Sequence, residues 1–376
     1  MQQANVTRND NSNIKTLVRK ALNSRLAERL SYPHGVDHYL QYLNPNWSIG
    51  EVRARVVSVH SQTPDTVTLQ LKPNSVWAGF KPGQFVRLTV SINGRLHSRC
   101  FSPAQSLHCA DGIIELTAKL HAKAFVTRYL RDELKPGDSI GLSQADGEFA
   151  LPDVRPERVL LISGGSGITP VMSMLRTLAD EGHSGAITFL HYANRATDQL
   201  YARELAAIAE AHANVTLLRC YVEGNEGELS GLFSAEQLHQ AVPDFAKAET
   251  FLCGPPGLMG AVEKVYGEMG LGGRLHLERF SAAPVVVSPD ESAEGDVHFT
   301  RSERYAANNG ATLLEQAEAA GLSPAYGCRM GVCYACTCHK TAGKVKDLRT
   351  GQVSDAGEGD IQICMSVPVG SVTLDL

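Results

Sequence analysis

The chain has 376 residues, more than one ordinary core accommodates, so two or three domains are expected. With 43% hydrophobic and 20% charged residues it is globular in composition, and its net charge of −5 gives no electrostatic reason to expect nucleic-acid binding. The sequence contains neither a run of about 20 apolar residues, as a membrane span requires, nor an apolar N-terminal segment typical of a secretory signal.

Residues 1–50 are predicted to form a helical N-terminal extension. In the segment 15–30, leucines recur near helical spacing and basic residues stand between them, so a helix there would be apolar on one face and positive on another. Such a helix can dock on an acidic membrane surface or an acidic partner, and it can equally pack on the following domain. Both interpretations stay open.

Residues 51–153 have the pattern of a small all-β domain. Short β-branched segments at 53–61, 66–71 and 85–92 are separated by turns that contain proline or glycine. Several such strands in succession predict an antiparallel β-barrel.

In residues 154–280, strand-like and helix-like segments alternate. Strands are expected at 158–163, 186–193, 215–222 and 250–256, with helical segments between most of them. Alternation of this kind predicts a doubly wound α/β domain with a parallel sheet.

Two turns of this α/β domain have the composition of a nucleotide site. The turn "GGSGITP" contains three glycines that let the backbone approach a pyrophosphate: Gly164, Gly165 and Gly167. Thr169 is expected to cap the next helix and Pro170 to be its first residue, so that the positive helix end faces the anion. A second turn, "CGPPG" at 253–257, follows a later strand at the same edge of the sheet, where such folds bind ligands.

Residues 281–295, rich in Ala, Ser, Pro and acid, are predicted to be a linker, and the block 296–376 follows. Three cysteines of that block, Cys328, Cys333 and Cys336, have C-x4-C-x2-C spacing. A fourth, Cys364, follows later in the sequence. This is the plant-type arrangement for a [2Fe–2S] cluster. A zinc site usually has two C-x2-C units, whereas this block has only one, so the spacing favours the iron–sulfur cluster. Nine cysteines without an export signal favour a reduced, cytoplasmic protein, where disulfides are improbable.

These motifs together resemble known families. The block 296–376, with "AYGCRMGVCYACTC", is similar to a plant-type ferredoxin domain, which implies a β-grasp fold. The two Gly-rich turns and "HSRCFSPAQ", the counterpart of an Arg-x-Tyr-Ser motif, resemble the ferredoxin–NADP reductase superfamily. The resemblance implies an antiparallel β-barrel flavin domain, an α/β NAD(P) domain and a C-terminal ferredoxin domain.

The resemblance also implies residue roles at the flavin. Within the motif that includes Cys100, Arg99 would bind flavin phosphate, Phe101 would lie on the isoalloxazine, and Ser102 would hydrogen-bond near its N5. Phe in place of Tyr removes one hydroxyl. A second phosphate-binding turn corresponds to the region of Ala124 and Thr127, where relatives usually have Gly and Ser. FAD is favoured over FMN, which stays an alternative.

By the same resemblance, Cys253 and Glu278 lie near the contact between nicotinamide and flavin, and Gly254 and Pro255 belong to the second nucleotide turn. A buried cysteine on a strand is, by itself, more often a packing residue, so Cys253 keeps both interpretations. Cys338 is separated from Cys336 by a single residue, and it is expected not to bind the cluster.

The choice between NADPH and NADH depends on the segment after the second strand of the α/β domain. Arg195 and Arg203 offer cations for a 2′-phosphate, whereas Asp198 could hold a ribose hydroxyl. The residues favour NADPH, with NADH as the alternative.

Hydride donation moves two electrons and a [2Fe–2S] cluster accepts one, so a flavin between them is chemically required. We therefore expect electrons to pass from NAD(P)H through flavin and cluster to an external protein. The N-terminal extension resembles that of reductases for membrane-bound di-iron acyl-CoA desaturases, which implies such a partner and peripheral contact with the inner face of a membrane. An aromatic-ring or alkane oxygenase is the alternative acceptor, and an NAD(P)H-sensing regulator or a zinc-stabilised binding protein are alternatives of other classes.

Overall fold

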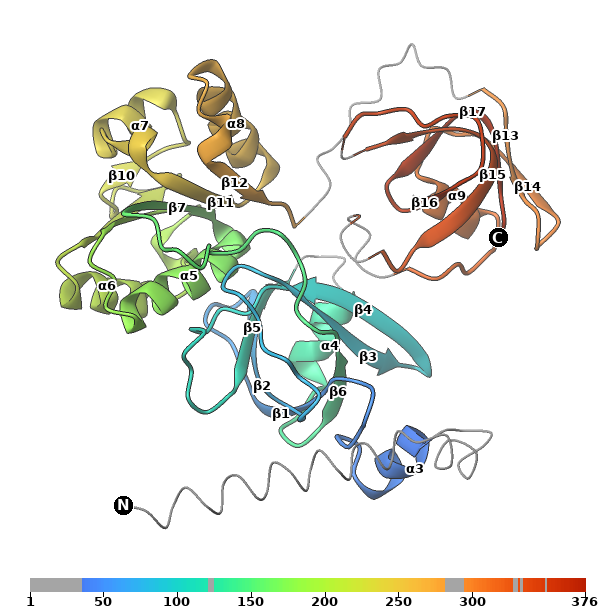
Figure 1. The fold of residues 1–376 in the computed structure, drawn as a ribbon, viewed down its shortest axis with the longest axis horizontal. Helices are drawn as coiled ribbons and strands as arrows, with labels where there is room; N and C mark the ends of the chain where they lie inside the picture. The colour runs from blue at the N-terminus through green and yellow to red at the C-terminus, as the bar shows by residue number, and fades with distance from the viewer. Residues whose placement is uncertain (1–35, 121–124, 281–293, 327–330, 332–333, 349) are drawn as a thin grey trace.

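The computed structural model describes residues 36–120, 125–280, 294–326, 331, 334–348 and 350–376. In this part of the chain the strands form three sheets, which lie within the three blocks expected from the sequence (Figure 1). The exact domain boundaries remain predictions.

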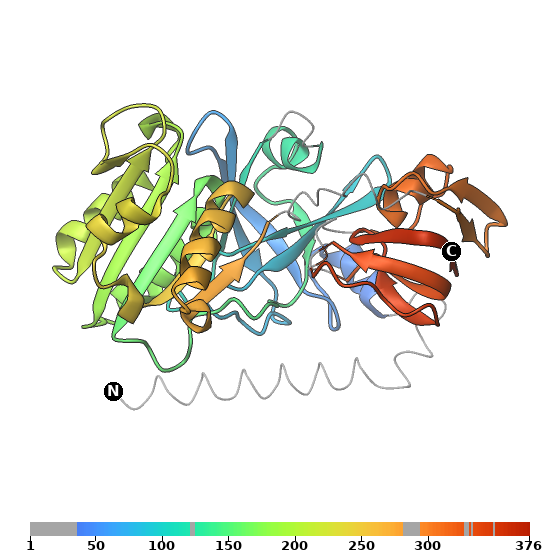
Figure 2. The ribbon, with the colours of Figure 1, turned by 90° about the horizontal axis from the view of Figure 1, so that it is seen from above.

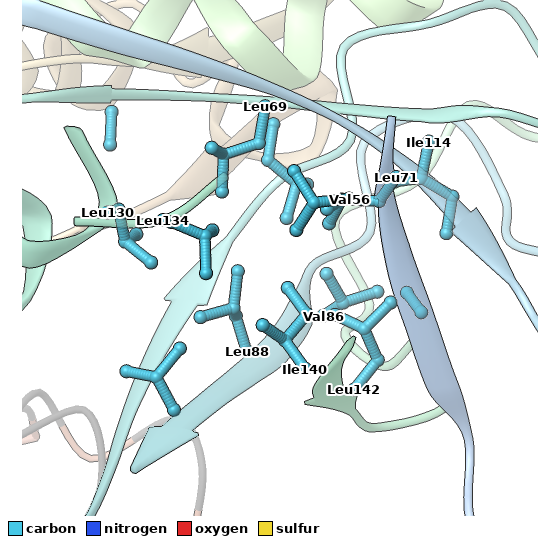
Figure 3. Close-up of a cluster of buried hydrophobic side chains, with 14 of the residues drawn as sticks. Val56, Leu69, Leu71, Val86, Leu88, Ile114, Leu130, Leu134, Ile140 and Leu142 are labelled. Carbon is cyan, nitrogen blue, oxygen red and sulfur yellow. The ribbon is translucent and has the colours of Figure 1, made fainter. Parts of the chain in front are cut away.

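The first sheet is antiparallel and has the strand order β4-β3-β6-β1-β2-β5. Its strands are β1 (Arg53–His60), β2 (Thr66–Pro73), β3 (Val86–Ile92), β4 (Arg95–Phe101), β5 (Ile114–Lys119) and β6 (Ser139–Leu142). A bridge between Pro103, two residues beyond β4, and Leu116 of β5 connects the two edges of the sheet, so the sheet curls into the expected barrel. Alternate apolar residues point inward and pack with Leu130 of helix α4 (Phe125–Asp132) (Figure 3).

The second sheet is parallel throughout and has the order β10-β9-β8-β7-β11-β12. Its strands are β7 (Arg158–Gly164), β8 (Ala186–Ala193), β9 (Val215–Tyr221), β10 (Leu229–Ser230), β11 (Glu249–Cys253) and β12 (Leu275–Glu278). Helices α5 (Ile168–Asp180) and α6 (Ala202–Ala211) cover one face, and α7 (Ala235–Ala241) and α8 (Pro256–Glu268) cover the other, where they lie in front of the strands in Figure 2. This is the doubly wound domain predicted from the sequence.

The start of α5 differs from the prediction. Gly165–Gly167 forms a short 3-10 turn that runs directly into a helix beginning at Ile168, with Gly167 at the N-cap. Thr169 therefore lies inside the first turn, where its hydroxyl donates to the carbonyl of Ser166, and it is not the cap. Pro170 is likewise not the first helical residue. The three glycines permit a 3-10 turn before the helix, so the helix begins earlier in the chain than the side-chain preference for Thr as N-cap predicts.

The third sheet is mixed, in the order β14-β13-β17-β15-β16, and packs against α9 (Leu313–Ala319). Its strands are β13 (Asp296–Phe299), β14 (Arg304–Ala307), β15 (Thr337–Asp347), β16 (Gly359–Gln362) and β17 (Ser366–Leu374). Thr312 and Glu315 cap α9 reciprocally, which fixes the helix start at the position where the sequence changes from polar to apolar. The topology is the β-grasp fold expected for this block.

Helix α3 (Val36–Leu43) precedes the barrel, and the segment 15–30 lies outside the described residues. The carboxylate of Asp37 accepts hydrogen bonds from Ser48 Oγ and the Ile49 amide, at 2.6 and 2.7 Å, so the helix is tied to the turn that leads into the barrel. None of its side chains is buried. Among the described helices, none is long and apolar enough to cross a membrane.

Candidate functional site

A cavity of about 810 Å³ lies at the carboxyl ends of the parallel strands. Both Gly-rich turns line it, through Gly164, Gly165 and Gly167 on one side and Gly254 and Pro255 on the other. These five of the residues that the sequence indicated for nucleotide binding are therefore together in one site, whereas Thr169, Pro170 and Cys253 do not line the cavity. This is the edge at which doubly wound sheets bind ligands.

Close contact between the two turns explains why glycine is required. A Cβ on Gly167 would stand 2.2 Å from the carbonyl oxygen of Cys253, and one on Gly164 would stand 2.6 Å from Pro255 Cδ. Gly165 has a φ of +53°, in the left-handed region that glycine adopts without strain. The turns form a backbone cradle into which a pyrophosphate fits, since no side chain fills it and the helix α5 begins there.

Three further residues line the cavity that the sequence patterns did not indicate. Lys119, at the end of β5 in the barrel domain, lines it and forms an ion pair with Asp65 at 3.0 Å. Phe280, beyond β12, and Phe233 supply aromatic surface. No motif marks these residues because tertiary folding brings them from separate segments, one of them in another domain.

Cys253 and Glu278 are direct neighbours in the pairing of β11 with β12. Cys253 is fully buried, burial raises the pKa of its thiol well above the usual value, and it does not line the cavity. Burial raises the pKa of the Glu278 carboxyl to about 7. Glu278 can therefore hold or release a proton near neutral pH, whereas Cys253 stays a thiol; the catalytic roles of both remain predictions.

The flavin motif lies on β4, and its pairing with β3 sets the side-chain directions. Arg99 stands opposite Leu88 and Phe101 opposite Val86, so both point to the face that carries the barrel core. Cys100 stands opposite Arg87 on the other face. Thr127 is half-buried in α4, whose first residue, Phe125, packs edge-on against the ring of His97 on β4.

Ser102 provides the best test of whether a flavin fits here. Its hydroxyl is buried and, within the described residues, has no hydrogen-bond partner. A buried hydroxyl is normally paired, so this oxygen is available for a polar atom of a ligand. Ser102 thus fits a polar contact to a bound flavin, and the flavin roles of Arg99, Phe101 and Thr127 remain predictions.

A polar network joins the barrel domain to the nucleotide domain. Arg176 of α5 donates to Glu115 of β5 at 2.9 Å, to the carbonyl of Ala104, and to Glu204 of α6 at 2.6 Å. Its guanidinium lies 4.9 Å from the ring centre of Tyr201, whose hydroxyl is 2.6 Å from Thr117 Oγ1. We call Arg176, Tyr201, Glu115, Thr117 and Glu204 the interdomain network. It holds the nucleotide cavity in a defined position relative to the flavin strand.

Two of the four predicted cluster ligands lie in the described residues. The sulfurs of Cys336 and Cys364 are 3.1 Å apart, close enough to bind one iron. Cys328 and Cys333 lie outside the described residues. The sulfur of Cys338 is 3.7 and 3.8 Å from the carbonyl oxygens of His339 and Asp375, and burial first, then Asp375, raises its thiol pKa to about 11. That Cys338 does not bind the cluster remains a prediction.

Residues Arg195 and Asp198 have different positions relative to the cavity. Asp198 lines it, whereas Arg195 does not; Arg195 follows the lining residue Asn194 in the chain and forms an ion pair with Glu223. Arg203 is exposed on α6 and does not line the cavity. The cation predicted to bind a 2′-phosphate is thus present near the site and already has a carboxylate partner.

Comparison with known families assigns each block a domain. Residues 53–151 match an oxidoreductase FAD-binding domain, residues 161–264 an oxidoreductase NAD-binding domain, and residues 297–369 a 2Fe-2S iron-sulfur cluster binding domain. These descriptions agree with the cofactor expected at each site.

Known proteins align with almost the whole chain. An NADPH oxidoreductase of Mycobacterium tuberculosis is 35% identical over 94% of this chain and 91% of the relative. A glycine betaine monooxygenase reductase subunit of Pseudomonas aeruginosa is 32% identical over 89% of this chain and 99% of its own length. The structure of phthalate dioxygenase reductase, 22% identical, has the same fold over 87% of this chain and 98% of its own, with a TM-score of 0.60.

Proposed function

The chain belongs to the ferredoxin–NADP reductase superfamily, as an NAD(P)H-dependent flavin and iron–sulfur reductase, and we propose that it delivers electrons to an oxygenase component. The observation that carries this proposal is the presence of FAD, NAD(P)H and [2Fe–2S] domains in one chain. The relatives support this class of acceptor, since the Pseudomonas aeruginosa protein is a glycine betaine monooxygenase reductase subunit.

The residues act by binding and positioning. When bound, NAD(P)H supplies hydride, FAD converts it into single electrons, and the [2Fe–2S] cluster carries these one at a time. The Gly-rich turns would hold the pyrophosphate, while Arg99 and Thr127 would hold flavin phosphate. Ser102 would donate to or accept from the flavin through its unpaired hydroxyl, and Glu278 would exchange a proton with water near neutral pH. The interdomain network keeps these groups in register.

Two variants of the purified protein test electron flow. Cys336→Ser should lose cytochrome c reduction at least 100-fold while NAD(P)H-dependent ferricyanide reduction, which needs the flavin alone, persists. Cys338→Ser is the matched control and should keep both activities and the cluster absorption bands. Failure of the unmodified protein to turn over either acceptor rapidly would favour the redox-sensing alternative, and a colourless protein would favour zinc.

Reconstitution tests the acceptor. The reductase is mixed with candidate oxygenase components, and product formation coupled to NAD(P)H consumption is measured. The proposal is supported if product formation coupled to NAD(P)H consumption is well above that of a control in which cytochrome c replaces the oxygenase. Absence of coupling with every oxygenase, together with coupling to a membrane desaturase, would replace the proposed acceptor.

A membrane-bound di-iron desaturase is the second candidate acceptor, because α3 and its following turn expose a group of apolar and aromatic side chains. Tyr42 and Leu43 are 78% and 77% exposed, and Trp47 is 53% exposed. Tyr and Trp are enriched at membrane interfaces. Co-sedimentation with anionic liposomes tests this proposal: deletion of residues 1–31 and the change Trp47→Ser should each lower binding, and unchanged binding of both would remove the membrane role.

A further inference from the structure

Gln362 is a buried glutamine of the iron–sulfur domain to which the electron path described above gives no role. It is the last residue of β16 and is 7% exposed. Neither the nitrogen nor the oxygen of its side-chain amide has a hydrogen-bond partner within the described residues, and both atoms are shielded from solvent. Buried polar side-chain atoms are normally paired, so this amide is available to a group bound beside it.

The backbone places Gln362 next to both cluster ligands of the described chain. In the pairing of β15 with β16 it stands opposite Thr337, the residue after Cys336. It also begins the turn that contains Cys364, in which the Met365 amide donates to the Gln362 carbonyl at 2.8 Å. The two ligand sulfurs are 3.1 Å apart. Paired residues of an antiparallel ladder are about 5 Å apart, so a glutamine side chain at this position can reach these sulfurs.

Gln316, the other buried glutamine among the described residues of this domain, is bonded differently. It lies in α9, and its amide nitrogen donates to the Ala311 carbonyl at 2.8 Å and to Asn308 at 3.4 Å. Only its oxygen has no partner in the same part of the chain. Gln316 therefore holds the segment before the helix in place. Gln362 makes no such contact, although an apolar side chain there would avoid the cost of burying an unpaired amide.

The chemistry of a cluster matches this amide. Cluster sulfides and cysteine thiolates accept hydrogen bonds and donate none, whereas a glutamine amide nitrogen carries two N–H donors. Hydrogen bonds to the sulfurs are among the features that set the reduction potential of an iron–sulfur cluster. They stabilise the reduced form more than the oxidised form, because reduction adds negative charge, so a donor at this place raises the potential.

We propose that the side-chain amide of Gln362 donates a hydrogen bond to a sulfur of the [2Fe–2S] site and raises its reduction potential. The inference rests on the proposed electron path, since it adds a residue that determines how completely electrons leave the flavin. At a given concentration of NAD(P)H, a higher potential at this site increases the fraction of protein with a reduced iron–sulfur site.

A redox titration of the holoenzyme, followed by EPR, tests the proposal. Gln362→Met keeps the length of the side chain and removes both N–H donors. It should shift the equilibrium toward the oxidised form about tenfold, which for one electron is 59 mV. Gln316→Met is the matched control, because it removes a buried amide of α9 that already has partners, and it should leave the potential unchanged.

A labelling measurement on the wild-type protein does not depend on how a variant folds. With nitrogen-15 in the glutamine side chains, pulsed EPR of the reduced protein should show a nitrogen-15 coupling, which Gln316→Met keeps and Gln362→Met loses. A potential of Gln362→Met within about twofold of wild type in this equilibrium, or no such coupling in the wild type, would overturn the proposal. An iron–sulfur site that dithionite reduces and NAD(P)H does not would instead contradict the proposed function.

Discussion

The nucleotide cavity and the interdomain network are built from different parts of the chain. At the cavity, backbone from two turns approaches so closely that no Cβ fits at Gly167. At the network, side chains from two domains meet, and Arg176 satisfies two carboxylates and a carbonyl. The cavity therefore depends on the absence of side chains, and the network on their identity.

This difference determines how each region responds to substitution. A backbone cradle tolerates no added volume, because the contacting atoms belong to rigid turns. A half-buried charge network fails when one partner is removed, since the remaining charges lose both water and counterion. The following predictions test each side of the comparison.

The largest effect is expected for Gly167→Ala. The new methyl group would meet the Cys253 carbonyl at 2.2 Å, so the two turns must separate. We expect destabilisation of about 3 kcal/mol or more and a loss of NAD(P)H-dependent flavin reduction, measured by urea unfolding and stopped-flow absorbance. Gly260→Ala on α8, where a Cβ meets nothing within 4 Å, is the control and should be neutral or slightly stabilising. Equal effects of the two changes would refute the cradle.

Arg176→Leu should destabilise the protein by about 3 kcal/mol, because it leaves Glu115 and Glu204 without their cation. Arg176→Lys keeps the charge and should lose less than half as much. Urea unfolding of the holoprotein measures both. If leucine is tolerated as well as lysine, the network has no role in joining the domains.

The buried carboxyl of Glu278 should give a pH response of its own. Its pKa is about 7 in the folded protein against an ordinary 4.5, so the folded state binds the proton more tightly. The resulting stability is complete below pH 4.5 and is lost as the pH rises through about 7. We expect a loss of about 2–3 kcal/mol between pH 4.5 and 8 that is missing in Glu278→Gln. Parallel pH profiles of the two proteins would show that this carboxyl does not titrate as described.

The smallest effect is expected for Tyr201→Phe. The change removes the hydroxyl that lies 2.6 Å from Thr117 but keeps the ring beneath Arg176. Thr117 retains Thr68 as a partner at 2.9 Å, so a loss of about 1 kcal/mol is expected from thermal unfolding. A loss as large as that of Arg176→Leu would mean that the hydroxyl, and not the guanidinium, dominates the network.

Much of the site was predictable where chemistry is local in sequence. The Gly-rich turns follow strands with clear patterns, so their meeting at one edge of a parallel sheet could be expected. The spacing of Cys328, Cys333 and Cys336 indicates a cluster before any folding is considered. The prediction that Thr169 is the N-cap of α5 was wrong, because the glycines before it permit a 3-10 turn and the N-cap is Gly167. Side-chain preferences do not indicate such a turn.

By itself, then, the sequence indicated the barrel, the α/β domain, the nucleotide turns and the cluster, because periodicity and motif spacing act over short stretches of chain. The flavin and the β-grasp fold came from the resemblance to known families. Tertiary structure alone decided that Lys119 reaches the nucleotide cavity, that Arg176 joins two domains, and that Glu223 forms an ion pair with Arg195. The physical reason is that charge pairing and burial depend on distances between segments remote in sequence. Such distances exist only after the sheets have packed.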